Sequence, residues 1–265
     1  LFNMFLSNNE KKISDQYLKQ GYVIRDINDI KSLNSVRESF CKIIKKKLPK
    51  IKEKKAKVIL NNIHNHVNSS ELNRFRLNII NKINAAKDFR ENFFKISKSL
   101  VEAIVGNEIA MQLRISLSIQ LPNDDSSLLP VHADTWSGLS PFETVIWLPL
   151  VDCYKTKSMY ILPPKKAGVL KNLFLNKKIK KTDDIFKKIQ KDLVWLKVKY
   201  GQVVIFDQSL PHGNIVNKEN ETRWTMNCRF KSIFTPYADK KIGEYYEPIT
   251  LKPASKRGIS YKLPK

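Results

Sequence analysis

The chain has 265 residues, of which 42% are hydrophobic, and this is enough for one domain with a sizeable core. Lys and Arg outnumber Asp and Glu by 48 to 25, which gives a formal net charge of +23. Because the excess is mostly Lys, we interpret it first as a solvated Lys-rich surface. Attraction of an anionic substrate is an alternative, and nucleic-acid binding is less favoured. Three cysteines without a Cys-x-x-Cys spacing argue against a disulfide framework and a structural zinc site. The sequence also has no long apolar run and no recognisable leader. Together these features predict a cytoplasmic protein without a membrane span.

The first hundred residues read mainly as helices. Apolar residues at helical spacing predict a helix over 9–20, and a short apolar segment predicts a strand over 21–26. Three further segments have the same helical spacing, namely 30–47, 73–84 and 89–106. His64 and His66 lie between them in an Asn-rich stretch without a carboxylate at ligand spacing, so we assign them no primary role in binding iron. Residues 1–109 are therefore expected to be a helical N-terminal portion.

From residue 110 the period changes from helical to alternating. Apolar and polar residues alternate strictly over 111–121, which predicts a strand whose polar face, with Gln112, lies either at the surface or beside a site. Five more strands are expected, at 144–150, 158–162, 194–199, 202–206 and 223–233. This set suits two packed antiparallel sheets over 110–235, interrupted by a Lys-rich, exposed insert at 165–192. The tail over 236–265 shows no periodicity and reads as ordered coil or partial disorder.

Two histidines, an aspartate and an arginine stand out by their order. His132 and Asp134 follow a strand-like segment, and residues two apart in an extended segment point to the same side. His212 comes eighty residues later, after a Gly-led apolar strand and a turn that contains proline. Two imidazoles and one carboxylate bind a divalent iron on one triangular face and leave the opposite positions open for a co-substrate and oxygen. In the following strand, alternation places four polar residues on one face: Arg223, Thr225, Asn227 and Arg229.

This ordered set resembles the Fe(II)/2-oxoglutarate-dependent dioxygenases, in particular the phytanoyl-CoA hydroxylase-like and taurine dioxygenase-like branches. In those families the second His is followed about eleven residues later by an Arg, the offset of Arg223 from His212. The resemblance covers roughly residues 110–232, and the stretch 138–163 is similar to members found with bacterial carbohydrate and aminoglycoside biosynthesis genes. Related halogenases replace the acidic ligand by a small residue, so the retained Asp134 favours hydroxylation or another oxidation.

The resemblance implies an α+β fold: a double-stranded β-helix (jelly-roll, cupin-like) core, with the N-terminal helices packed on it, in one domain over 1–265. It implies Fe(II), 2-oxoglutarate as co-substrate and O2. His132, Asp134 and His212 would bind the iron, and Arg223 would bind the distal carboxylate of 2-oxoglutarate, since a guanidinium stays charged when desolvated. Arg229 would either assist there or form a salt bridge at the rim of the barrel. Three further residues hold places where relatives contact the co-substrate or form the wall: Asn214, Ser158 and Trp147.

The substrate implied by the resemblance is a small polar metabolite, a sugar or nucleotide-linked sugar in surface-polysaccharide or related biosynthesis. Trp136 and Glu143 are expected in the loop after the metal pair, and Gln120 and Arg114 on the polar strand face, as substrate contacts. Two alternatives stay open. A nucleic-acid-directed oxygenase of the AlkB type also carries an Arg-x5-Arg pair, as at 223 and 229. A non-catalytic, cupin-like binding protein is the other alternative, although every expected ligand type is retained.

Overall fold

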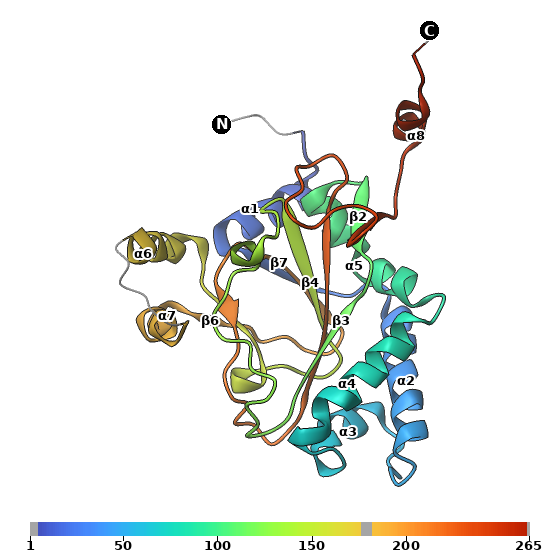
Figure 1. Ribbon diagram of the computed structural model, residues 1–265, viewed down its shortest axis with the longest axis vertical. Coiled ribbons are helices and arrows are strands. Elements are labelled where there is room, and N and C mark those ends of the chain that lie inside the picture. Colours follow the sequence, from blue (N-terminus) through green and yellow to red (C-terminus); the bar gives the residue numbers. More distant parts are fainter. Residues whose placement is uncertain (1–4, 176–181, 264–265) are drawn as a thin grey trace.

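The N-terminal helices pack against the central sheet. The computed structural model describes residues 5–175 and 182–263 (Figure 1). Ser7 and Glu10 form a reciprocal capping box at the start of the first helix, and Gly21, at φ 79°, ends it in the left-handed conformation that glycine adopts without strain. The expected N-terminal helices are confirmed, and α3 is an additional one; their bounds are α1 (Asn8–Gln20), α2 (Ile30–Lys47), α3 (Ala56–Asn61), α4 (Ser69–Asn84) and α5 (Phe89–Val105).

A large antiparallel sheet forms the centre of the fold. Its strands lie in the order β1-β7-β4-β9-β2-β10, and β3 also pairs with β9. The bounds are β1 (Tyr22–Asp26), β2 (Ile109–Gln112), β3 (Ser116–Gln120), β4 (Glu143–Pro149), β7 (Gln202–Asp207), β9 (Arg223–Ser232) and β10 (Tyr246–Pro248). The central strands divide their side chains between two faces. Trp224, Met226, Cys228 and Phe230 of β9 belong to the core that the sheet shares with the helices, whereas the residues between them face the other way.

A small antiparallel sheet packs on that other face. It contains β6 (Val194–Trp195), β5 (Tyr160–Ile161) and β8 (His212–Gly213), in this order. Side chains of both sheets, such as Trp147 and Phe206 from the large one and Ile161 from the small one, form one buried cluster. The predicted pair of packed antiparallel sheets is therefore present, and the site described below lies between them.

The strand expected over 111–121 is divided in two. β2 pairs Met111 with Phe230, whereas β3 pairs Ser116 with Asn227, so two extra residues are inserted opposite β9. At the interruption, Asn84 of α4 binds both the N–H and the carbonyl of Ile115, each at 3.0 Å. A helix side chain thus takes the place of a strand partner at Ile115. The segment 111–121 therefore bends at this point, although its sequence alternates without interruption.

The insert contains helices, and the tail contains more structure than the sequence indicates. α6 (Pro164–Leu175) and α7 (Thr182–Ile189) lie in the insert, while 176–181 lie outside the described residues. The tail contributes β10 and α8 (Pro253–Ser260), and Tyr246 in it is fully buried. The three cysteines are buried and unpaired, as predicted. No helix in the described ranges has the length and apolar character needed to span a membrane.

Candidate metal centre

His132, Asp134 and His212 come together between the two sheets. His132 and His212 form an antiparallel bridge, in which each backbone N–H donates to the other's carbonyl at 2.9 and 2.8 Å. Asp134 begins a short 3-10 helix, η2 (Asp134–Ser137), directly after this bridge. One possible ligand atom from each of the three residues lies within 4.8 Å of the other two. Within the described ranges, this is the only group of three or more His, Cys, Asp and Glu residues with that proximity.

Both imidazole rings have Nδ1 occupied by a backbone carbonyl, which leaves Nε2 available to a metal. The Nδ1 atoms of His132 and His212 each lie 2.8 Å from a backbone carbonyl two residues earlier, those of Pro130 and Leu210. A carbonyl oxygen only accepts hydrogen bonds, so Nδ1 carries the proton and Nε2 keeps its lone pair. Burial, followed by the neighbouring His132, lowers the pKa of His212 to about 4. The neutral, ligand form of His212 is therefore stable well below neutral pH.

The third member of the group, Asp134, is fixed by Arg229. Its Oδ2 accepts hydrogen bonds from Nη2 and Nε of Arg229, at 2.5 and 3.2 Å. Its Oδ1 lies 3.7 Å from Nε2 of His132 and so faces the centre of the group. Although burial would lower the pKa of Arg229, the Asp134 carboxylate raises it. Of the two roles considered from the sequence, Arg229 thus has the salt bridge, and its partner is a candidate metal ligand.

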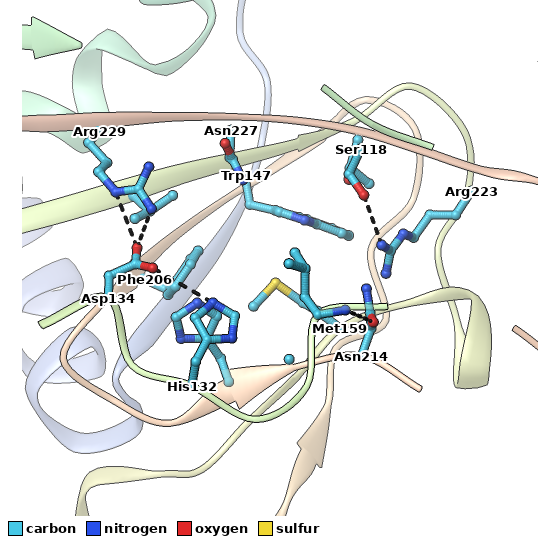
Figure 2. Close-up of a pocket in the computed structure, with 15 residues that line it drawn as sticks. Ser118, His132, Asp134, Trp147, Met159, Phe206, Asn214, Arg223, Asn227 and Arg229 are labelled. Carbon is cyan, nitrogen blue, oxygen red and sulfur yellow. Dashed lines mark hydrogen bonds and ion pairs between the residues drawn. The ribbon is translucent and has the colours of Figure 1, made fainter. Parts of the chain in front are cut away.

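A cavity of about 270 Å³ joins this group to Arg223 (Figure 2). Figure 2 shows His132 and Asp134 at one end, Arg223 at the other, and Trp147 and Met159 between them. All four residues predicted to share a face of β9 line the cavity, which confirms the alternation: Arg223, Thr225, Asn227 and Arg229. Val145 and Phe206 contribute apolar wall from β4 and β7.

Arg223 is a buried cation that forms no ion pair with any residue in the described ranges. Its Nη1 and Nη2 donate to the carbonyl of Ser158 and the hydroxyl of Ser118, at 3.2 and 3.1 Å, and its Nε has no partner among the described residues. Only 2% of the residue is exposed, and burial lowers its pKa to about 10, so it is still charged at neutral pH. A buried charge is costly unless it is paired. The site therefore offers a strong place for a carboxylate or another anion inside the cavity.

The other residues expected around the co-substrate are close to this cavity in different ways. Trp147 and Asn214 both line it. The side-chain oxygen of Asn214 accepts from the backbone N–H of Leu129 at 2.9 Å, so it also holds the neighbouring loop. Ser158 is fully buried behind Arg223, where its carbonyl is occupied and its hydroxyl has no partner among the described residues.

None of the four residues suggested as substrate contacts lines the cavity. Arg114 is wrong for this role because it lies at the break between β2 and β3, exposed, where it donates to Asn81 of α4. Glu143 is not in a loop: it begins β4 and is 2% exposed. Gln120 is fully buried and donates to the carbonyl of Ile215, while Trp136, in η2, is exposed at the surface.

Two residues beside the candidate site, Met159 and Gln208, were not identified from the sequence. Neither belongs to a motif, and only the fold brings them to the site. Met159 packs in the cavity wall beside Trp147. Gln208 is fully buried: its side chain bonds to Arg229 and Glu143, and its backbone carbonyl accepts from the backbone N–H of Asp134. The signal available in the sequence was only its place, four residues before His212 in the turn that follows a buried strand.

Solved structures of similar fold are non-heme enzymes. A non-heme monooxygenase, described as a ThoJ complex with nickel, is similar with a TM-score of 0.56 at 11% identity, over 93% of this chain and 91% of that chain. The non-heme alpha-ketoglutarate-dependent carbocyclase SnoK from nogalamycin biosynthesis gives 0.54 at 14% identity, over 93% and 97%. The alpha-ketoglutarate-dependent epimerase SnoN from the same biosynthesis gives 0.51 at 12% identity, over 91% and 95%. The chain therefore shares the mixed helical and antiparallel, cupin-like fold of these enzymes. No protein-family model and no curated protein matches the sequence.

Proposed function

We propose that the protein is an Fe(II)- and 2-oxoglutarate-dependent oxygenase. The observation that carries this proposal is the cavity itself. It has a His-Asp-His group at one end and, at the other, the guanidinium of Arg223, which has no ion-pair partner among the described residues. A five-carbon dicarboxylate needs two such ends, one that chelates through its keto acid and one that pairs with its distal carboxylate. The two imidazoles and one carboxylate are the donor set of a mononuclear iron site with open positions.

In this proposal each residue has a defined task. His132, Asp134 and His212 hold the iron, and Arg223 binds the distal carboxylate of 2-oxoglutarate through its guanidinium. When bound, iron with 2-oxoglutarate and oxygen supplies the oxidation of an unactivated C–H bond. Trp147, Met159 and the other apolar residues of the wall exclude water, and Arg229 keeps the second oxygen of Asp134 away from competing partners. Asn214 and Ser158 are proposed to support the co-substrate end of the cavity.

For the substrate we propose a small polar metabolite, a sugar or a nucleotide-linked sugar. The sequence similarity of 138–163 to carbohydrate-cluster oxygenases motivates this class. SnoK and SnoN are named for the biosynthesis of a small molecule, which supports a metabolite over a macromolecule. The net charge of +23 would attract phosphorylated sugars.

The co-substrate site is tested by anaerobic titration calorimetry, first with Fe(II) and then with 2-oxoglutarate. Arg223→Met should weaken 2-oxoglutarate binding by about 100-fold or more, since it removes charge-assisted hydrogen bonds of about 3 kcal/mol, and should leave iron binding nearly unchanged. Arg25→Met is the matched control, because Arg25 donates to Gln16 and Ile24 away from the cavity. Equal 2-oxoglutarate affinity in the Arg223→Met variant and the parent would exclude the proposed role.

The substrate class is tested by a coupled screen. Succinate release is measured with nucleotide sugars, free amino acids, acyl-CoA thioesters and methylated single-stranded DNA. We expect substrate-dependent release with a sugar compound. Strong coupling to methylated DNA, with none to any carbohydrate, would move the protein to the nucleic-acid-directed class.

A further inference from the structure

Gln208 holds the candidate metal ligand Asp134 at two points. It lies in the turn between β7 and β8, and its backbone carbonyl accepts from the backbone N–H of Asp134 at 2.9 Å. Its side-chain Oε1 accepts from Nε of Arg229 at 3.0 Å, and the same Nε donates to Asp134 at 3.2 Å. One fully buried residue therefore fixes both the backbone of Asp134 and the guanidinium that grips its carboxylate.

The amide of Gln208 has only one satisfactory orientation. Its Nε2 donates to Oε2 of Glu143 at 2.7 Å and to the carbonyl of Ser140 at 3.0 Å. A carboxylate only accepts and a guanidinium only donates, so the NH2 group must face Glu143 and the oxygen must face Arg229. Glu143 is 2% exposed, which leaves water little access to replace this contact. The buried carboxylate thus determines which atom of Gln208 reaches the guanidinium.

We propose that Gln208 is a positioning residue of the metal centre, and that Glu143 fixes its amide so that Arg229 turns one oxygen of Asp134 away from the metal. Oδ2 of Asp134 receives both hydrogen bonds from Arg229, which leaves Oδ1 toward His132. The pair Gln208 and Glu143 acts behind Arg229 and touches neither metal nor co-substrate. This inference rests on the metal site of the proposed function and adds to it a support that extends from η2 to β4.

The first experiment uses Co(II) as the probe, bound anaerobically to the whole chain. The measurements are the Kd from calorimetry and the visible absorption of the bound Co(II), which reports the ligand geometry. Gln208→Met should raise the Kd by about 10-fold or more and change the spectrum, as expected when a group that orients a ligand is lost. Gln120→Met is the matched control, since Gln120 is also fully buried and bonded, but to the carbonyl of Ile215. The control should stay within about 2-fold of the parent, because it orients no ligand.

A charge swap separates positioning from general damage to the core. Gln208→Glu alone places two carboxylates together and should weaken Co(II) binding at least as much as Gln208→Met. Adding Glu143→Gln restores a donor opposite an acceptor between residues 208 and 143 and keeps an acceptor for Arg229, while the carbonyl of Ser140 loses its donor. The double variant should therefore bind Co(II) more tightly than Gln208→Glu alone and regain the spectrum of the parent. Thermal unfolding of the metal-free variants shows whether each one folds. If Gln208→Met does not fold, the comparison of Gln208→Glu with the double variant still tests the positioning role.

The outcomes distinguish the two proposals. If the parent binds no Co(II) at this group, the metal site fails and the positioning role fails with it. If the parent binds Co(II), and Gln208→Met gives the same Kd and spectrum, only the positioning role is refuted. A double variant that binds no better than Gln208→Glu alone would also refute it.

Discussion

At the scale of single residues, Arg223 has the environment that best distinguishes a binding site from a structural one. Its charge is buried and, among the described residues, donates only to a carbonyl and a hydroxyl, whereas the less buried Arg229 is paired with Asp134. The sequence predicts that both face the same side, because they are six residues apart in a strand. It does not predict which arginine pairs with Asp134, because that depends on where the fold places Asp134 at the start of η2.

The first prediction follows from the cost of this buried charge. Arg223→Met should leave the ligand-free protein as stable as the parent or more stable by about 1 kcal/mol, since an apolar side chain of similar length replaces an uncompensated cation. Chemical denaturation of the metal-free proteins measures this difference. Arg229→Met should do the opposite and lower stability, because it leaves Asp134 buried without its partner. A large loss of stability in the Arg223 variant would mean that the arginine is structural.

The second prediction concerns pH and His212. The pKa of His212 is about 4 in the fold, against about 6.5 for an unfolded histidine, so between these values the unfolded chain takes up more protons. This contribution to stability is complete above pH 6.5 and is lost as the pH falls toward 4. From pH 7.5 to 5.5, the metal-free protein should lose about 1 kcal/mol through His212 alone.

Urea unfolding at the two pH values measures this loss, with His212→Gln as the comparison. Glutamine keeps a polar side chain of similar size but does not titrate, so its loss over the same interval should be smaller by about 1 kcal/mol. Equal losses in the parent and in His212→Gln would show that His212 is not held neutral by the fold.

At the scale of elements, long periodic segments are predictable and short pairings are not. β9 alternates over its full length, and its two faces are those the sequence indicates. β8 has two residues and no period, yet it carries His212. It exists because β5 and the backbone of His132 pair with it. The strict alternation of 111–121 predicts one strand, but Asn84 of α4, distant in sequence, interrupts it. Side-chain roles that depend on such long-range contacts, including those of Glu143 and Gln208, cannot be derived from local pattern.

The third prediction concerns β8, where Gly213 packs closely against its neighbours. A Cβ added at Gly213 would lie 2.7 Å from the carbonyl oxygen of Leu129 and 2.7 Å from the hydroxyl of Tyr160. Gly213→Ala should therefore displace the strand, lower stability by about 1–3 kcal/mol and weaken metal binding at the adjacent His212. The measurements are thermal unfolding and Co(II) affinity.

Gly168→Ala provides the control for this variant. Gly168 lies in α6, and a Cβ added there would meet no atom within 4 Å. The change should be neutral or stabilise the helix by about 0.5–1 kcal/mol, without effect on the metal. If Gly213→Ala were as harmless as Gly168→Ala, β8 would not be constrained as described.

At the scale of the whole molecule, the large sheet has the apolar core on one face and the candidate site on the other. The helices and one face of the large sheet share an apolar core, and the other face joins the small sheet around the cavity. The overall arrangement of helices followed by two packed sheets could be predicted from the change of period near residue 110. The tail could not, because Tyr245 and Tyr246 are placed by contacts with Arg229 and with the sheet rather than by a pattern of their own.

The fourth prediction uses the net charge of +23, which acts on the molecule as a whole. Like charges repel in the compact state, so raising the ionic strength from about 10 mM to about 150 mM should raise the Tm of the metal-free protein. Differential scanning calorimetry at a series of NaCl concentrations measures this. Sodium perchlorate at equal ionic strength is the control for specific chloride binding. A Tm that is constant or falls with salt would show that repulsion between the lysines does not destabilise the compact state.

The most direct test of the central claim is the electron density of the protein crystallised without oxygen in the presence of Mn(II) and 2-oxoglutarate. The account predicts a single metal bound by Nε2 of His132, Nε2 of His212 and the carboxylate of Asp134. It also predicts that 2-oxoglutarate spans the cavity, with its distal carboxylate against the guanidinium of Arg223. A metal bound elsewhere, or a co-substrate whose distal carboxylate leaves Arg223 unpaired, would contradict it.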